Sequence, residues 1–360
     1  MRKVVSFLVV LALAAGALLP GSPLVAKAMA SGGEKTTPKG KNPSSRPGPT
    51  APTAPTAPTE DGEESFLLSF VGDCTLGSDA RFYGVKYSFI DVIGEDYDYP
   101  FRNVVQYFQE DDCTFVNLES VLKDEGSIIK ENGFAFRGPT AYTKILTGSS
   151  VEAVTIANNH IRDYGVPGVE STRRALEEAE LPYVEQDTYR VLTTDSGLHI
   201  GIYGGFFQVD VKKVEKAVAE LKRQGAELIV MAIHWGIEGF NRPNAEQEKL
   251  AHDLIDLGVD IVYGCHPHVL QRVEQYNGGI IYYSLGNFSF GGNHYPSDMD
   301  TVILQQQVLR HKDGTVTLGT LTPIPACVSS QKPRNDFQPT PYKEGTEDYA
   351  RVLQKLSLEE

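Results

Sequence analysis

The chain has 360 residues, of which 41% are hydrophobic, and its formal net charge is -14 at pH 7. This length and apolar content support a substantial core and exclude a wholly disordered chain. The acidic excess disfavours a general nucleic-acid binder, because phosphate contacts require clustered cations, so we expect no nucleic-acid partner.

The first 30 residues have the pattern of an export signal. Met1-Arg2-Lys3 precedes an apolar run over residues 4–19, and small residues that suit cleavage follow at Ala28 and Ala30. The run is slightly short for a membrane span. We therefore expect either a cleaved signal peptide or an uncleaved N-terminal anchor. Either reading places the protein at the extracellular face of the cell membrane or in the secreted fraction.

Residues 31–64 form a predicted linker. They are rich in Pro, Thr, Ser and Gly, and they repeat the triplet Ala-Pro-Thr over residues 51–59. A stretch with so few apolar side chains to bury stays extended and disordered.

From residue 65 onward, short apolar runs alternate with helical patterns. Strands are predicted at 66–71, 113–118, 151–156, 198–203, 227–233 and 259–263, and helices at 99–110, 139–146, 166–179, 211–223 and 244–257. This alternation is typical of a mainly parallel sheet.

The pattern changes after residue 264. Four further strands, at 269–274, 280–284, 301–308 and 315–321, follow one another without helices, which indicates added antiparallel pairing. A two-sheet sandwich flanked by helices fits both halves, so we predict one α/β domain over residues 65–327. Residues 328–360 form a polar tail with a short helix near 344–356, which either packs back or stays loose.

The four cysteines show no C-x-x-C pair. We interpret them as isolated core residues, and one or two disulfides in an exported chain are the alternative. They are Cys74, Cys113, Cys265 and Cys327.

Five of the predicted strands end in residues of metal-ligand type. The carboxyl ends of parallel strands converge on one crevice, so these groups should meet. Carboxylate, amide and imidazole ligands together suit one or two divalent ions such as Mn, Fe or Zn, and two such ions can clamp a phosphoryl group. The residues are Asp73, Asn117 with Glu119, Asn158 with Asn159 and His160, His234, and His266 with His268.

Each of these residues also has a structural explanation when taken alone. Asp73 could cap a turn, Asn158 and Asn159 could form one, and His234 beside Trp235 could be a hydrogen-bonded core histidine. Residues of metal-ligand type recur at five strand ends, and this recurrence favours a shared metal site over five independent structural roles.

Seven motifs in chain order make residues 66–310 resemble the CapA family of poly-γ-glutamate capsule proteins. The family is related to calcineurin-like metallophosphatases, so the resemblance implies a four-layer α/β/β/α sandwich. The motifs are VGDCTLG (71–77), NLES (117–120), FRGP (136–139), ANNH (157–160) with DYG (163–165), HWGIE (234–238), GCHPHVLQ (264–271) and YSLGNF (283–288).

The resemblance also implies roles for individual residues. Asp73 and His268 would ligate a first metal, Asn159, His234 and His266 a second, and Glu119 would bridge the two. His160 is similar to the catalytic imidazole that protonates or stabilises a leaving group. The side chains that would orient the ligands are Asn117, Asn158, Glu238 and Asn287.

Two positions depart from the expected pattern. Thr75 stands where metallophosphatases carry an imidazole two residues after the first aspartate, which weakens the expected first site. Ser78 stands where many CapA-like chains carry arginine. Arg137, or alternatively Arg81, would then supply the cation that binds substrate.

The resemblance predicts a cell-surface protein of capsule synthesis or export, acting on poly-γ-glutamate or a related polymer. Its partners would be the capsule polymer or the synthase membrane complex, and the cell membrane if the N-terminal segment is retained. One alternative is an extracellular metal-dependent phosphoesterase. The other is a non-catalytic, membrane-anchored assembly partner. Fold alone does not decide among them.

Overall fold

The computed structural model describes residues 63–128 and 133–358. The predicted export segment and nearly all of the predicted linker lie outside these residues. Within the described ranges, no helix is both long enough and apolar enough to cross a membrane. The described residues all belong to one unit of the chain.

The first sheet is built around the long strand β1 (Glu64–Thr75), which carries Asp73 near its end. β1 pairs in parallel with β3 and β14 and antiparallel with β15. In order across the sheet, the strands are β17 (Thr340–Pro341), β16 (Val316–Cys327), β15 (Asp300–Arg310), β1, β3 (Cys113–Leu118), β6 (Ala153–Thr155) and β7 (Tyr183–Val184), with β14 (Asn287–Phe290) beside β1.

The second sheet contains four parallel strands flanked by an antiparallel strand at each edge. Its order is β12 (Val273–Tyr276), β13 (Gly279–Tyr282), β11 (Ile261–Cys265), β10 (Leu228–His234), β9 (His199–Phe206) and β8 (Tyr189–Thr193). A small third sheet joins β2 (Ser78–Asp79), β5 (Phe136–Gly138) and β4 (Val121–Leu122).

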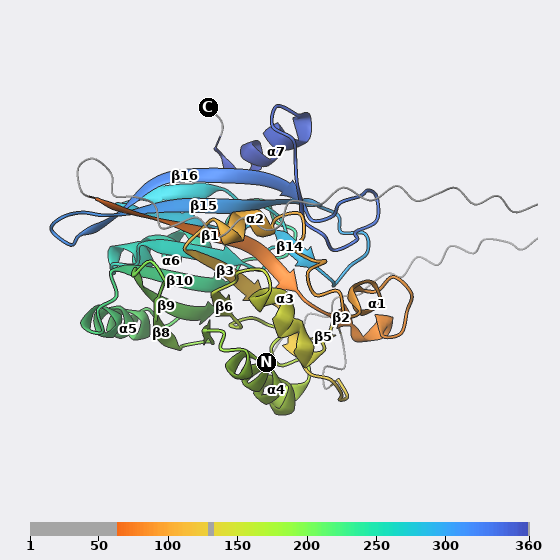
Figure 1. Ribbon diagram of the computed structural model, residues 1–360. Helices are drawn as coiled ribbons and strands as arrows, with labels where there is room; N and C mark the ends of the chain where they lie inside the picture. The colour runs from red at the N-terminus through yellow and green to blue at the C-terminus, as the bar shows by residue number, and fades with distance from the viewer. Residues whose placement is uncertain (1–62, 129–132, 359–360) are drawn as a thin grey trace, which may run out of the picture. The chain divides into compact units, whose positions relative to one another are not determined.

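The two large sheets pack face to face over an apolar core. Phe70 of β1 stacks on Phe115 of β3 at 4.7 Å between ring centroids, and it also contacts Tyr263 and Tyr282 of the second sheet. Figure 1 shows β15 and β16 side by side in the first sheet, and α5 against β8 and β9 of the second.

Helices cover the outer face of each sheet. The first sheet is covered by α1 (Phe89–Ile93), α2 (Val105–Gln109), α3 (Thr143–Thr147) and α4 (Gly165–Glu178), and the second by α5 (Val211–Arg223) and α6 (Ala245–Asp256). Two short 3-10 helices, η1 (Ala80–Phe82) and η2 (Thr140–Tyr142), precede α1 and α3. The predicted four-layer α/β/β/α sandwich is therefore confirmed.

α5 and α6 begin where their sequences supply caps. The Asp210 side chain accepts a hydrogen bond from the Lys212 N–H at the start of α5. Asn244 and Gln247 form a reciprocal capping box at the start of α6. Along α5, buried apolar residues recur with helical spacing and pack on the second sheet. They are Val214, Ala217, Val218 and Leu221.

Two expectations about secondary structure need correction, and some elements were not predicted. The helix predicted over 99–110 is reduced to α2, because residues 99–104 form successive turns such as Arg102 N–H to Tyr99 O. The strand predicted at 269–274 begins only at Val273. One of these is β14, which pairs in parallel with β1 beside Asp73 and was not predicted, because a strand of four residues directly after Gly286 carries little periodic signal.

The segment after Cys327 packs against the domain. β17 pairs with β16, Phe337 is fully buried, and α7 (Glu347–Leu356) contacts β16 and β15. Val352 and Leu356 of α7 join the core between the sheets. The tail is thus part of the folded body. All four cysteines are buried and free, in line with their interpretation as core residues.

Candidate metal centre

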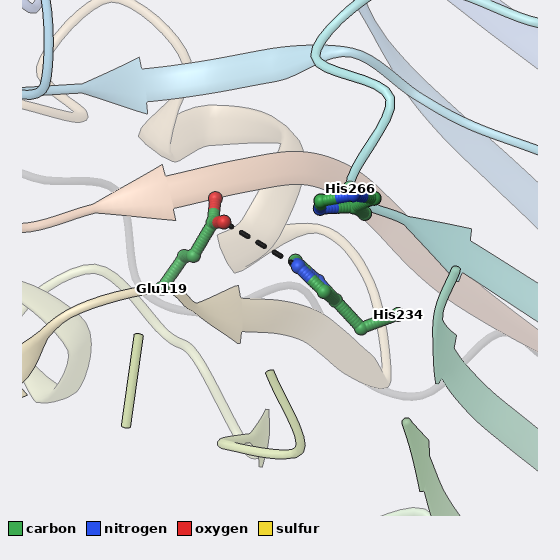
Figure 2. Close-up of side chains that lie close together, drawn as sticks. All are labelled: Glu119, His234 and His266. Carbon is green, nitrogen blue, oxygen red and sulfur yellow. Dashed lines mark ion pairs between the residues drawn. The ribbon is translucent and has the colours of Figure 1, made fainter. Parts of the chain in front are cut away.

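Residues of metal-ligand type from both sheets meet at one place. Asp73 of β1 lies beside Asn117 of β3 in the strand register, and His234 ends β10 beside Cys265 of β11. Figure 2 shows Glu119, His234 and His266 directed toward one another from three separate segments. The convergence follows from the parallel strands, whose carboxyl ends share one edge.

Glu119 is the most unusual side chain in this cluster. It is fully buried, and neither carboxylate oxygen accepts a hydrogen bond from any described residue. Its Oε1 lies 3.4 Å from His234 Nε2, 3.7 Å from His268 Nε2 and 3.8 Å from His160 Nε2. Burial raises the pKa of Glu119 well above its usual range. A buried carboxylate without hydrogen bonds is costly, and a bound cation would satisfy it.

Two groups of possible ligands share this carboxylate. Asp73, Glu119 and His268 form one triplet, and Glu119, His234 and His266 form the other, with ligand atoms within 4.8 Å of one another in each. Asn159 belongs with the second group, because its Oδ1 lies 2.7 Å from His234 Nε2. The buried Nδ1 of His266 also has no partner among the described residues.

Hydrogen bonds hold Asp73 as an anion. Its Oδ1 accepts from Asn117 Nδ2 at 2.7 Å, and its Oδ2 accepts from the backbone N–H of His266 at 3.1 Å. Burial alone would raise the pKa of Asp73, but the hydrogen bond and charge of His268 lower it to about 2. Burial alone would likewise lower the pKa of His268, but Glu119 and Asp73 raise it to about 10.

The other two candidate imidazole ligands, His234 and His266, stay neutral. Burial lowers the pKa of His234 well below its usual range and that of His266 to about 4. A neutral imidazole is the form that ligates a metal. The donor set thus offers carboxylates, two neutral imidazoles, a carboxamide oxygen and the imidazole of His268, which would lose its proton on binding a metal. Such a set fits a divalent ion such as Mn, Fe or Zn. The ligand roles themselves stay predictions.

Asparagines fix the positions of these groups. Asn117 Nδ2 also lies 3.3 Å from His234 Nδ1, and its Oδ1 accepts from Asn158 Nδ2 at 3.1 Å. Asn158 Oδ1 in turn accepts from the backbone N–H of His160. Asn287 Oδ1 lies 2.9 Å from His268 Nδ1. Asn117, Asn158 and Asn287 therefore have the contacts expected of orienting residues.

His160 is oriented by a carboxylate to which the sequence interpretation assigned no role. Asp163 Oδ2 lies 2.7 Å from His160 Nδ1 and also accepts from the backbone N–H of Phe136 at 2.8 Å. An imidazole held at Nδ1 presents Nε2 for proton transfer, and here Nε2 faces Glu119. The signal in the sequence is the spacing, since Asp163 follows His160 by three residues within one motif.

Two hollows flank the cluster. One, of about 320 Å³, is lined by residues that include His160, Glu238, His268 and Asn287. The other, of about 680 Å³, is lined by residues that include Phe206, Phe207, Trp235 and Ile237. Among the described residues, neither hollow is lined by a lysine or an arginine. A negatively charged ligand would therefore depend on a metal ion for its positive partner.

Arg137, the predicted substrate-binding cation, does not line either hollow. Its guanidinium stacks over the rings of Tyr83 and Tyr164, and its Nε donates to the Tyr83 hydroxyl at 2.8 Å. Arg81 pairs with Asp79 at 2.6 Å. The substrate contact of Arg137 stays a prediction, and the structure shows a packing role for its side chain.

The arrangement could support proton transfer beside a bound metal ion. When bound, a metal would supply Lewis-acid stabilisation of negative charge. The residues that would hold it are Asp73, Glu119, Asn159, His234, His266 and His268. His160, oriented by Asp163, can hold or deliver a proton at Nε2 beside this group. The hollow on its open side can admit a substrate.

Comparison with known proteins places these motifs in a family. The family model described as bacterial capsule synthesis protein PGA_cap matches residues 67–186 and 185–292. The chain is similar to the capsule biosynthesis protein CapA of Bacillus anthracis, at 28% identity over 299 residues, covering 75% of this chain and 70% of the relative. It is also similar to the PGA biosynthesis protein CapA of Bacillus subtilis, at 27% over 301 residues, covering 75% and 76%.

More distant similarities were also found. A probable polyglutamine synthesis accessory protein of Mycobacterium tuberculosis is 24% identical over 208 residues, covering 49% of this chain and 55% of the relative. Among solved structures, the NAD nucleotidase of Haemophilus influenzae aligns with a TM-score of 0.40 and 12% identity, covering 83% of this chain and 56% of that chain. A structural likeness at that level carries no conclusion. The family match, by contrast, spans more than half of the chain and every cluster residue named above, and the chain therefore belongs to the bacterial capsule synthesis protein (PGA_cap) family, as its CapA-like motifs predicted.

Proposed function

We propose that this protein acts in the synthesis or export of a capsule polymer, poly-γ-glutamate or a related one, and that a divalent metal at Glu119 is required for that role. The family match and the names of the Bacillus relatives support the process. The buried carboxylate of Glu119, without a hydrogen-bond partner among the described residues, is the observation that carries the metal requirement.

The charge of the protein supports a metal-dependent contact with the polymer. The net charge is -14, and no described lysine or arginine lines either hollow beside the cluster. A polymer rich in carboxylates would be repelled by such a surface unless a bound cation reverses the local field. The polymer or the membrane-bound synthase complex would then meet the protein at the extracellular face of the membrane, where the N-terminal pattern would direct it.

Replacing single residues in the chromosomal gene, with the amount of surface polymer as the readout, tests this role. His234→Ala and His266→Ala remove imidazoles from the cluster. His252→Ala serves as a matched control, since His252 of α6 pairs with Glu274 of β12 and belongs to none of the candidate metal groups. The proposal predicts loss of surface polymer with the first two variants at normal protein abundance, and wild-type polymer with the control. Wild-type polymer in all three strains would contradict the metal requirement.

A second candidate function, an extracellular metal-dependent phosphoesterase, is favoured by one observation. The His160–Asp163 pair faces Glu119, in the place of a general acid beside the metal ligands. The purified chain supplied with Mn²⁺ should then hydrolyse a generic aryl phosphate, and His160→Ala and Asp73→Ala should abolish the activity. Absence of turnover with every common divalent ion would favour a non-catalytic assembly partner that holds a structural ion.

A further inference from the structure

We propose that Glu238 is itself a metal ligand of this site, acting with His266 and His268. This inference rests on the metal binding proposed above and goes beyond it, since Glu238 was expected only to orient other ligands. The ion it suits is one that accepts both carboxylate and imidazole, such as Mn²⁺. Glu238 would add a donor to a cluster that carries Thr75 where metallophosphatases carry an imidazole.

The geometry places the three ligand atoms within reach of one ion. A carboxylate oxygen of Glu238 and one ring nitrogen each from His266 and His268 lie within 4.8 Å of one another. Ligands bind such ions at roughly 2.0–2.2 Å, so two ligands on opposite sides of one ion lie up to about 4.4 Å apart. A small side-chain adjustment is therefore sufficient for all three to bind together.

The backbone around Glu238 is built to face the two imidazoles. Gly236 and Gly239 on either side of it both have positive φ, +83° and +76°, which glycine adopts without strain. The Gly239 N–H donates to Pro267 O at 2.8 Å, and Pro267 lies between the two histidines. The loop that carries Glu238 is thus tied directly to the turn that carries His266 and His268.

That turn is itself strained. His266 has a φ of +101° and His268 a φ of +57°, in a region that side chains other than glycine rarely adopt. Backbone strain of this kind concentrates at functional sites, where the surrounding structure maintains it. Here the strain directs both rings toward the cluster, and Glu238 lies across from them on the wall of the hollow that also contains His160.

No described residue, within 63–128 and 133–358, forms a hydrogen bond or an ion pair with Glu238. Its side chain is exposed. Thr75, in contrast, is fully buried and its Oγ1 has no hydrogen-bond partner in the same ranges. A hydroxyl at that position offers a much weaker ligand than an imidazole, whereas an unpaired carboxylate at Glu238 is available to bind.

Mn²⁺ binding to the purified full chain tests the assignment. The chain is stripped of metal and titrated with Mn²⁺, and free Mn²⁺ is measured by electron paramagnetic resonance. Loss of a residue that only orients a ligand costs roughly 10- to 100-fold in metal affinity. We expect Glu238→Gln to weaken one Mn²⁺ site by more than this, and Glu238→His, which provides an imidazole, to recover most of that loss. Glu246→Gln is the matched control, an exposed acid in the neighbouring hollow, and should bind as wild type.

Two results would overturn the assignment. Wild-type affinity in Glu238→Gln would show that Glu238 is not a ligand, while leaving the proposed metal role intact. An equal loss in Glu238→Gln and Glu246→Gln would show a general effect of negative charge. If the wild-type chain, with a normal circular dichroism spectrum, bound no Mn²⁺, both this assignment and the proposed metal requirement would fail.

Discussion

Replacing Asp300 by asparagine should loosen the contact between α7 and the first sheet. Asp300 begins β15 and is only 4% exposed. Its carboxylate accepts two hydrogen bonds from Arg351, at 2.7 and 2.8 Å, and one from Lys355 at 2.8 Å. Lys355 also pairs with Asp298, which lines the hollow beside His160, so α7 braces one wall of that hollow.

The size of the effect follows from the pKa of Asp300. Burial alone would raise this pKa, but the hydrogen bonds from Arg351 and Lys355 outweigh burial and lower it from 3.8 to about 2. A folded-state pKa below the unfolded value adds stability above pH 3.8 that is lost as the pH falls toward 2. A difference of nearly two pKa units corresponds to about 2 kcal/mol of unfolding free energy at pH 7.

Urea denaturation at pH 7 and at pH 2.5 measures this contribution. Asp300→Asn should lower the unfolding free energy by about 2 kcal/mol at pH 7 and by much less at pH 2.5. Asp348→Asn is the control, because Asp348 also pairs with Arg351 but is 40% exposed, so its loss should matter far less. Equal losses at both pH values, or equal losses in the two variants, would show that the buried ion pairs of Asp300 do not stabilise the fold in this way.

Three further changes test other parts of the structure. Burial raises the pKa of Glu152 from 4.5 to about 8, so folding favours its protonated form and the stability of the fold falls as the pH rises from 4.5 to 8. In thermal denaturation, Glu152→Gln should therefore be more stable than wild type at pH 9 and about as stable as wild type at pH 4. Asp163→Asn should cut any phosphoesterase rate at least about tenfold with Mn²⁺ content unchanged, because it misorients His160; a loss of metal instead would argue against this role. Gly72→Ala would place a Cβ 2.3 Å from the backbone oxygen of Gly286, so we expect a loss of about 2–3 kcal/mol or more in urea denaturation.

Much of the fold could be predicted because its patterns are long and regular. The apolar spacing and capping residues of α5 define its bounds, and its predicted range, 211–223, matches the helix in the structure. β14 and the start of β12 were not predicted correctly, because their positions depend on pairing with β1 and β13, which no local pattern encodes. The same holds for the tail, whose packing depends on Asp300, far away in sequence.

The cluster was predictable for a different reason. Asp73, Glu119 and His234 each end or follow a strand-like run, and parallel strands bring their ends together. The residues around the cluster were harder to predict from the sequence. The pairing of Asp163 with His160 and the position of Glu238 depend on loops, whose conformations are set by contacts between distant segments.

The central claim is that Glu119 and its neighbouring imidazoles hold a divalent ion. Elemental analysis of the purified full chain, after dialysis against buffer with trace Mn²⁺, Fe²⁺ and Zn²⁺, tests it most directly, beside a His234→Ala, His266→Ala double variant. We predict one or two ions per wild-type chain and a clear loss in the double variant. A correctly folded wild-type chain without metal, or equal metal in both proteins, would contradict it.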